Sequence, residues 1–305
     1  MVKKMKVIRV IPYGYCKGVV NAINLVKKEI ENNTKANIHL LGNIIHNKFV
    51  KDALVNENVI IHDTFGKSRL ELLDEIEDGI VIFSAHGVSD TTREKAIAKG
   101  LQIIDASCED VLKTQIIIKE YLANQYTIFY IGKEHHPEAE AMIGLDSNRI
   151  ILVTSDSVIP RNISGKTVVT CQTTMSLFEV RELVDSLMAL YPETIFMDEI
   201  CNATRLRQEA LLKLNPKEMD LLIIVGDLQS NNTNSLRKIA QAQGMNHIIL
   251  IESINDLDES LLLDVNVVGI TAGASTPPYI VTTVIEYLEL FPTVKKEAID
   301  YSKVL

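Results

Sequence analysis

The sequence lacks any apolar run long enough to cross a membrane as a helix. Its N-terminal stretch, MVKKMKVIRVIPYG, has no apolar segment followed by a small-residue cleavage site, so it does not resemble a signal peptide. Positive charge is also scarce, because 31 Lys and Arg residues face 40 Asp and Glu residues, for a net charge of -9. A nucleic-acid partner would require a basic face. We therefore expect a cytoplasmic protein that binds neither a membrane nor nucleic acid.

Cysteine is rare, and the four cysteines are far apart. Cys16, Cys108, Cys171 and Cys201 include no closely spaced C-x-x-C pair of the kind that is usual in structural zinc sites. In a reducing compartment such cysteines are more often metal ligands, reactive thiols or core residues than disulfide partners. The sequence also contains no G-x-G-x-x-G fingerprint of a dinucleotide-binding loop.

What the chain does contain, over 305 residues, is a regular alternation of short β-branched segments and amphipathic segments. Strand-like segments such as GIVIFSA and LLIIVG are apolar on both faces, which is typical of buried parallel strands. Helix-like segments such as VVNAINLVKKEIENN and VLKTQIIIKEYLANQ lie between them. This repeated βα pattern predicts an α/β fold with parallel sheets covered by helices.

Three of the cysteines recur at nearly equal intervals and in the same local context. Cys16 and Cys108 are 92 residues apart (108 − 16), and Cys108 and Cys201 are 93 apart (201 − 108). Each follows a strand-like segment and precedes a helix-like one. The repeat predicts three similar α/β units arranged pseudo-threefold, with the three thiols meeting at helix N-termini that favour the thiolate. The predicted boundaries are 1–16 for a strand that joins the third unit, 17–107, 108–200 and 201–292 for the units, and 293–305 for an amphipathic or frayed tail.

Two kinds of metal site are compatible with these cysteines. A tetrahedral zinc site would need all four thiolates, including Cys171, which breaks the pattern and is expected to be a core or pocket-wall residue. Three thiolates without a fourth partner suit an iron–sulfur cluster that leaves one iron open for a substrate. The spacing alone leaves both interpretations open.

Polar side chains follow many of the strand-like segments, in the loops where parallel α/β sheets bind ligands. Histidine, hydroxyl and amide side chains, together with backbone N–H groups at helix N-termini, are suitable donors for a diphosphate. Glu138 can deliver a proton if burial or a nearby anion raises its pKa. The other candidates are His46, Asn47, His86, His135, His136, Thr173, Thr174, Ser230, Asn231, Asn232 and Ser275. His39, His62 and His247 have no supporting context and are expected to be structural or solvated.

The chain resembles the LytB/IspH family of 4-hydroxy-3-methylbut-2-enyl diphosphate reductases. The resemblance rests on a set of motifs in one order, namely GYCKGVVNAI, IIHN, FSAHGVS, DASC, HPE, QTTMS, ICNAT with RQ, SNNTNS and TAGAS. As a set these motifs are specific, and they cover nearly the whole chain.

The resemblance implies three α/β domains around a central cluster and assigns roles by position. Glu138 matches the acid that feeds protons to the substrate, helped by Thr173 and His136 as catalytic residues. The matching cluster ligands are Cys16, Cys108 and Cys201. The matching substrate-binding residues are His46, His86, His136, Thr174, Ser230, Asn231, Asn232 and Ser275.

The implied cofactor is a [4Fe-4S] cluster with three cysteine ligands and one open iron that binds the substrate hydroxyl. The implied reaction removes this hydroxyl reductively and gives isopentenyl and dimethylallyl diphosphate, the last step of non-mevalonate isoprenoid synthesis. Because the chain has no dinucleotide fingerprint, reduced ferredoxin or flavodoxin is the expected electron donor.

The sequence departs from the family pattern at several positions. Asn231 stands where a serine is usual, Cys171 where a hydroxyl or small residue is usual, and Asn202 in place of an aromatic residue. Gln115 replaces a common histidine. None of these changes removes a cluster ligand or the proton donor. The alternatives are a paralogue that acts on a different small substrate, a non-catalytic iron–sulfur sensor, and a zinc-stabilised structural protein.

Overall fold

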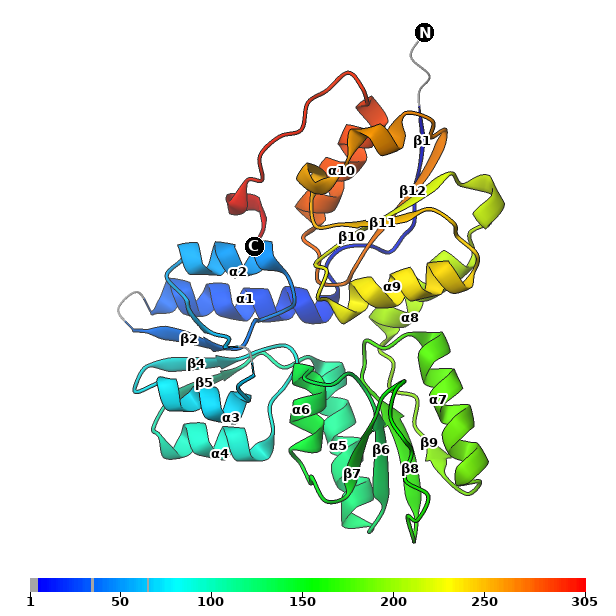
Figure 1. Ribbon diagram of the computed structural model, residues 1–305. Coiled ribbons are helices and arrows are strands. Elements are labelled where there is room, and N and C mark those ends of the chain that lie inside the picture. Colours follow the sequence, from blue (N-terminus) through cyan, green and yellow to red (C-terminus); the bar gives the residue numbers. More distant parts are fainter. Residues whose placement is uncertain (1–4, 34–35, 65) are drawn as a thin grey trace. The chain divides into compact units, whose positions relative to one another are not determined.

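The structure, a computed structural model, describes residues 5–33, 36–64 and 66–305. In these residues the strands form three four-stranded sheets in which every pairing is parallel (Figure 1). The strands are β1 (Lys6–Arg9), β2 (Ile38–Leu41), β3 (Ile60–His62), β4 (Ile80–Phe83), β5 (Gln102–Asp105), β6 (Thr127–Ile131), β7 (Ile150–Val153), β8 (Thr167–Cys171), β9 (Ile195–Phe196), β10 (Leu221–Val225), β11 (Ile248–Ile251) and β12 (Val267–Ala272). The helices are α1 (Lys17–Asn32), α2 (Lys48–Asn56), α3 (Arg69–Leu72), α4 (Asp90–Ala98), α5 (Glu109–Ala123), α6 (Pro137–Ile143), α7 (Leu177–Leu190), α8 (Asn202–Leu212), α9 (Asn231–Ala242) and α10 (Pro278–Leu290).

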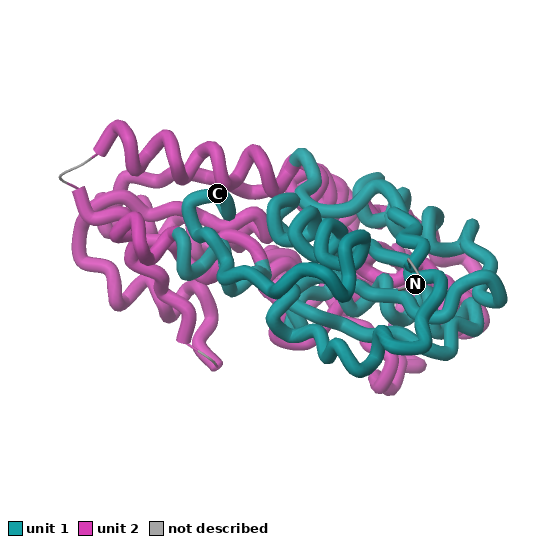
Figure 2. The backbone as a smooth tube through the Cα atoms, turned by 90° about the horizontal axis from the view of Figure 1, so that it is seen from above, with its two compact units in different colours: residues 1–17, 46–53, 202–305 teal, residues 18–45, 54–201 magenta. Residues whose placement is uncertain are grey.

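The chain divides into two compact units, which Figure 2 colours separately. Unit 1 comprises residues 1–17, 46–53 and 202–305, and unit 2 comprises residues 18–45 and 54–201. One of the three sheets belongs to unit 1 and the other two belong to unit 2.

Unit 1 is built on the sheet β1-β12-β10-β11. All five residues of β10 are buried, as expected for a parallel strand that is covered on both faces. β1 pairs with β12, with Val7 beside Val268, so the start of the chain completes a sheet that is otherwise made from residues 221–272. The helix α10 packs against both of these strands.

The C-terminal segment of the chain packs against the rest of unit 1. Val304 is only 1% exposed, and its carbonyl accepts a hydrogen bond from the Tyr15 hydroxyl at 2.9 Å. The Tyr301 ring lies 6.2 Å from the Phe49 ring, and Lys296 donates to the Leu257 carbonyl. The buried Val304 beside the exposed residues 301–303 fits the amphipathic alternative of the predicted tail, whereas the specific hydrogen bonds argue against the frayed alternative.

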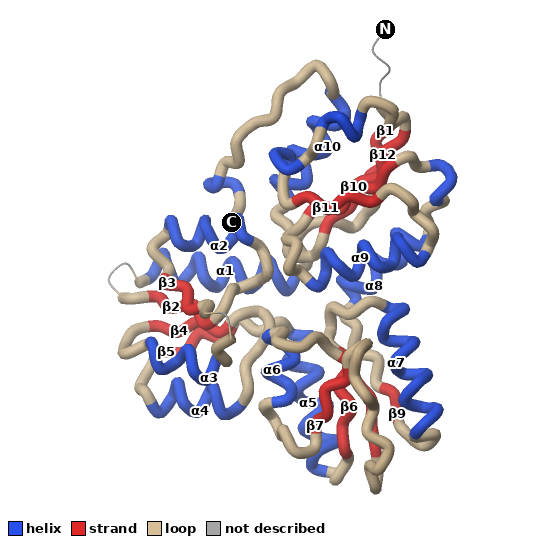
Figure 3. The backbone as a smooth tube through the Cα atoms, in the orientation of Figure 1, coloured by secondary structure: helices blue, strands red, loops and turns tan. Residues whose placement is uncertain are grey.

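Unit 2 contains the sheets β3-β2-β4-β5 and β7-β6-β8-β9 (Figure 3). Each sheet has an apolar core of its own, formed around Phe83 in the first sheet and around Phe129 and Tyr130 in the second. These described cores share no residue.

Polar residues connect the two sheets of unit 2. Arg69 donates to Glu140 twice, from its backbone N–H at 2.7 Å and from its guanidinium at 3.3 Å. Gln115 donates from its side-chain amide to the Val88 carbonyl at 2.9 Å. We call this set, Arg69, Val88, Gln115 and Glu140, the polar seam.

The predicted α/β fold class with parallel sheets is confirmed. The short strand β3, with no buried residue, was not predicted. The proposed boundaries at 17–107, 108–200 and 201–292 and the pseudo-threefold arrangement stay predictions. Within the described residues, none of the helices has both the length and the apolar character needed to cross a membrane.

Candidate active site

The three sheets share one strand order, although their strands come from different parts of the chain. Each sheet can be listed from the edge strand that comes directly before one of the three cysteines. The strand orders are then β1-β12-β10-β11, β5-β4-β2-β3 and β9-β8-β6-β7. Cys16 follows β1, Cys108 follows β5 and Cys201 follows β9, so each cysteine comes after the first strand of its order. The equal spacing in the sequence therefore reflects equal positions in three sheets of the same topology.

The backbone next to each cysteine repeats as well. In all three cases the cysteine N–H donates to the carbonyl that lies two residues past the end of the adjacent second strand. The pairs are Cys16 to Ala274 at 3.1 Å, Cys108 to Ala85 at 3.0 Å and Cys201 to Thr173 at 3.0 Å. Each cysteine is thus tied to a loop that carries candidate substrate-binding residues.

Most of the candidate substrate-binding side chains occupy only two positions in this repeat. Three residues past the second strand of each order stand His86, Thr174 and Ser275. Five residues past the third strand of each order stand His46, His136 and Ser230. Since the carboxyl ends of parallel strands are where ligands bind, this repeated placement supports a shared role for these residues.

Glu138 has the most unusual environment among the candidates in unit 2. It lies in the first turn of α6 and is 1% exposed. Thr173 donates to both of its carboxyl oxygens, from the backbone N–H at 2.7 Å and from the hydroxyl at 2.9 Å. Burial raises the pKa of Glu138 to about 7, and these hydrogen bonds oppose the rise. A carboxyl with such a pKa can both give and take a proton near neutral pH.

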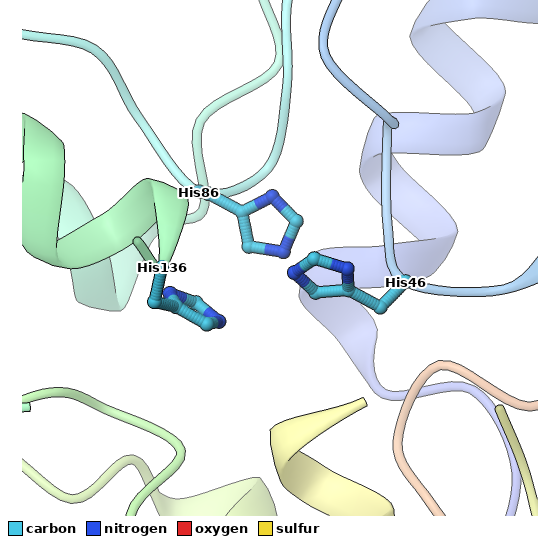
Figure 4. Close-up of side chains that lie close together, drawn as sticks. All are labelled: His46, His86 and His136. Atoms are coloured by element: carbon cyan, nitrogen blue, oxygen red, sulfur yellow. The ribbon is translucent and has the colours of Figure 1, made fainter. Parts of the chain in front are cut away.

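Two imidazoles of unit 2 are in contact with each other, and one of them caps the helix that carries Glu138. His136 caps α6, and its Nδ1 accepts a hydrogen bond from the Glu138 N–H at 3.1 Å. The rings of His136 and His86 meet edge to face with centroids 5.4 Å apart. Figure 4 draws both side chains. The Nδ1 of His86 lies 3.3 Å from the Ser84 hydroxyl. His46, also drawn in Figure 4, belongs to unit 1.

In unit 1 the candidates gather at the start of α9. Ser230 occupies the N-cap position of this helix without a side-chain capping bond, and its hydroxyl lies 3.2 Å from the hydroxyl of Ser275, with both residues buried. Asn231 and Asn232 are the first two residues of the helix, and Asn232 accepts a hydrogen bond from Thr204 at 3.1 Å. The first turn contains no acidic residue, so the backbone N–H groups and the helix dipole favour an anion here.

The four thiols fall into two classes. All four are reduced, and Cys16, Cys108 and Cys201 are partly exposed, whereas Cys171 is fully buried. Burial raises the pKa of Cys171 to about 12, so this side chain is a neutral thiol at physiological pH. The donor set therefore fits a group that takes three thiolates rather than four. The convergence of the three partly exposed sulfurs stays a prediction.

Other loop candidates have structural positions. Asn47 caps α2, because its side-chain oxygen accepts the N–H bonds of Phe49 and Val50 at 3.1 and 3.2 Å. His135 is exposed. Asn202, one of the departures from the family pattern, is exposed at the first position of α8.

The sequence did not predict a role in the site for two residues that support it. Tyr130 looks like a core residue in TIFYIG, yet its hydroxyl lies 3.4 Å from Glu138. Arg207 is buried and donates to the Gly14 carbonyl at 2.7 Å, which holds the loop before Cys16. The RQ motif was the only signal for Arg207, and no local signal marked Tyr130.

Comparison with known proteins decides the family. The family model described as LytB protein matches residues 7–289. The chain belongs to the LytB family. Since that match spans all but the ends of the chain, membership applies to both units.

Relatives in the LytB family match most of the chain. The 4-hydroxy-3-methylbut-2-enyl diphosphate reductase of Geobacillus kaustophilus is 42% identical over 290 residues, which cover 94% of this chain and 91% of the relative. The enzyme of the same name from Symbiobacterium thermophilum is 40% identical over 291 residues, covering 94% and 98%.

Solved structures of the LytB family agree with the fold. The E-1-hydroxy-2-methyl-but-2-enyl-4-diphosphate reductase of Plasmodium falciparum has a TM-score of 0.85 at 30% identity and covers 95% of this chain and 89% of its own. A second structure is titled (E)-4-hydroxy-3-methyl-but-2-enyl diphosphate reductase, the terminal enzyme of the non-mevalonate pathway. It has a TM-score of 0.64 at 29% identity and covers 93% and 99%.

Proposed function

We propose that this chain is a reductase that converts 4-hydroxy-3-methylbut-2-enyl diphosphate into isopentenyl and dimethylallyl diphosphate. The observation that carries the proposal is the Glu138 carboxyl, which is buried, has a pKa of about 7 and is held by Thr173, on a helix that His136 caps. LytB relatives that are 40% and 42% identical bear the name of this activity.

The reaction needs two electrons and two protons, because the substrate loses its hydroxyl as water and gains a hydrogen on carbon. Glu138 supplies the proton that the departing oxygen requires. A group with a pKa near the working pH is suited to this task, since a useful fraction is protonated and transfer is not strongly uphill. Thr173 orients the carboxyl, and His136 anchors the start of α6 that carries it.

We assign the diphosphate to hydroxyl, amide and imidazole side chains rather than to a cluster of lysines. In unit 1 the α9 N-terminus with Ser230, Asn231, Asn232 and Ser275 supplies donors, and His46 adds an imidazole. In unit 2 the donors are His86, His136 and Thr174. Binding energy from this anionic group positions the reacting hydroxyl, which is distant from it in the substrate.

We assign Cys16, Cys108 and Cys201 as the ligands of a [4Fe-4S] cluster with one open iron. When bound, such a cluster supplies a Lewis-acid iron for the hydroxyl and single electrons for its removal. The support is the donor set, since three thiols in equivalent topological positions are accessible and Cys171 is buried.

We further infer that reduced ferredoxin or flavodoxin delivers the electrons, because the sequence contains no dinucleotide fingerprint. A cytoplasmic location is the corresponding inference, since cluster thiolates require a reducing compartment.

The test is anaerobic purification with iron and sulfide analysis, followed by assay with the allylic diphosphate and a strong artificial reductant. We expect three cysteine ligands to hold the cluster and both isomeric products to form. A loaded protein that turns over no allylic diphosphate would contradict the proposal and favour a sensor. Turnover of a different small substrate would instead indicate a paralogue, and zinc without a visible chromophore would indicate a structural site.

A further inference from the structure

The core beside α6 contains a tyrosine hydroxyl in an otherwise apolar setting. Tyr130 is 0% exposed and packs with Val111, Ile118, Ala139 and Met142 from α5 and α6. Its ring has little freedom, because a Cβ built on Gly132 would lie 2.9 Å from a ring carbon of Tyr130. The direction of its hydroxyl is therefore set by the packing of the core.

The repeat of the three sheets shows that packing alone does not require this hydroxyl. Tyr130 pairs with Thr170 at the next-to-last position of its strand. The equivalent residues in the other two sheets are Leu40, paired with Ile82, and Ile224, paired with Thr271. Both Leu40 and Ile224 are also 0% exposed. An aliphatic side chain fills this position twice, and the tyrosine occurs in the sheet that carries Glu138.

The hydroxyl of Tyr130 reaches the carboxyl of Glu138. It donates to Oε1 at 3.4 Å, and the same oxygen accepts the Thr173 N–H at 2.7 Å. Burial raises the pKa of Tyr130 well above its ordinary value of 10.0, so the hydroxyl keeps its proton and stays a donor.

We propose that Tyr130 is a positioning residue for proton transfer, which holds the Glu138 carboxyl in place and favours its ionised form over its protonated form. This inference rests on the proposed function of Glu138 as the proton donor. Tyr130 does not itself reach solvent, so it acts through Glu138 and not as a relay.

The other titratable groups around Glu138 do not replace this hydrogen bond. Asp110 on α5 raises the pKa of Glu138 by charge repulsion. Cys171 on β8 is a neutral thiol, and His136 accepts the backbone N–H of Glu138. A donor to the carboxylate opposes the effect of burial, so its removal should raise the pKa of Glu138 further.

The test is the Tyr130→Phe variant, which keeps the ring and removes one hydroxyl. Few carboxyl groups in a protein stay protonated above pH 6, so the infrared carbonyl band of protonated Glu138 should stand clear of other carboxyl bands there. The band is followed against pH, and its absence in Glu138→Gln identifies it. We expect the midpoint of this titration, with and without the cluster, to rise by about 0.5 to 1 pH unit. In a plot of turnover rate against pH, the decline on the alkaline side should move to higher pH by the same amount.

Tyr126→Phe is the matched control, because this half-buried tyrosine lies just before the same strand and should leave both titrations unchanged. A carbonyl band that does not move in Tyr130→Phe overturns the inference. A band that moves while the rate profile stays in place would instead overturn the role of Glu138 in the proposed function. Tyr130→Leu, which copies the equivalent Leu40, provides the same test if circular dichroism shows that Tyr130→Phe has altered the fold.

Discussion

Thr173 directs two hydrogen-bond donors at the Glu138 carboxyl, with its N–H 2.7 Å from Oε1 and its hydroxyl 2.9 Å from Oε2. The two bonds fix the plane of the carboxyl and keep part of the population ionised, while burial works in the opposite direction. This balance gives a buried acid that titrates near neutral pH.

Replacing Glu138 with glutamine should remove most of the activity and leave the cluster in place. The amide oxygen of glutamine can accept the Thr173 N–H, and its NH₂ can donate to the Thr173 hydroxyl, so the fold should persist. Loss of a general acid typically costs about 10² to 10⁴ in rate. Turnover, iron content and visible absorption measure the two effects separately.

Glu134→Gln is the control for that variant, since Glu134 is an exposed carboxyl four residues earlier. It should keep full activity. Full activity in Glu138→Gln would show that the proton comes from another group.

The raised pKa of Glu138 should also make stability depend on pH. Its pKa rises from the ordinary 4.5 to about 7 in the folded protein, so the folded state binds the proton more tightly than the unfolded state. Stability should therefore fall as pH rises from about 4.5 to about 7 and level off above that range. The loss should be on the order of 3 kcal/mol, because each pKa unit corresponds to about 1.4 kcal/mol.

Urea unfolding of cluster-free protein at pH 5 and pH 8 measures this dependence. Glu138→Gln should lack this contribution, so it should gain stability relative to the original chain at pH 8. Equal pH dependence of the two proteins would show that Glu138 is ionised across the range.

Cys108→Ser should lose the cluster, because it removes one of three assigned ligands. We expect the iron and sulfide contents to fall to near background and the visible absorption to fall with them. Cys171→Ala is the matched control, since this thiol is fully buried and carries a proton at neutral pH. The assignment fails if Cys108→Ser binds as much iron as the original chain.

Gln115→Ala should weaken substrate binding more than it slows turnover. The Gln115 amide donates to the Val88 carbonyl at 2.9 Å, and Val88 lies two residues after His86. Without this bond the His86 loop loses an anchor, so KM should rise about 3- to 10-fold, a cost of about 1 kcal/mol.

Gln115→His, which restores the residue common in the family, keeps a ring N–H donor and should recover the original KM. Ile116→Ala, on the exposed side of the same helix, should have no effect, as Ile116 is 58% exposed. An unchanged KM in Gln115→Ala would remove the anchoring role.

The sequence predicted the parts of the site that depend on local signals. The strand-to-helix junctions at Cys16, Cys108 and Cys201 were visible because the β-branched run, the cysteine and the amphipathic run lie next to one another. The shared strand order of the three sheets could not be predicted from local signals, because it depends on pairings between distant segments, such as β1 with β12. Tyr130 was missed for the same reason, because only the fold brings its hydroxyl to Glu138.

His39 and His62 were expected to be structural or solvated, and the fold gives them structural contacts that the sequence did not specify. Their ring nitrogens lie 2.9 Å apart, and His62 lies 3.1 Å from Glu75. The pair forms because β3 places His62 beside Leu41 on β2. β3 is three residues long and has no buried residue, so its hydrophobic pattern was too short to predict a strand. The histidine pair, which depends on this strand, was therefore not predicted either.

The polar seam of unit 2 has a consequence for how this unit can move. The two sheets keep separate apolar cores, and the contacts between them include an ion pair and an amide–carbonyl bond. Arg69 and Gln115 are only 5% and 8% exposed, so parting the sheets would leave a buried charge and a buried amide without their partners. The polar seam should therefore lock the two sheets in one relative position, and with them the separation of His86 and His136.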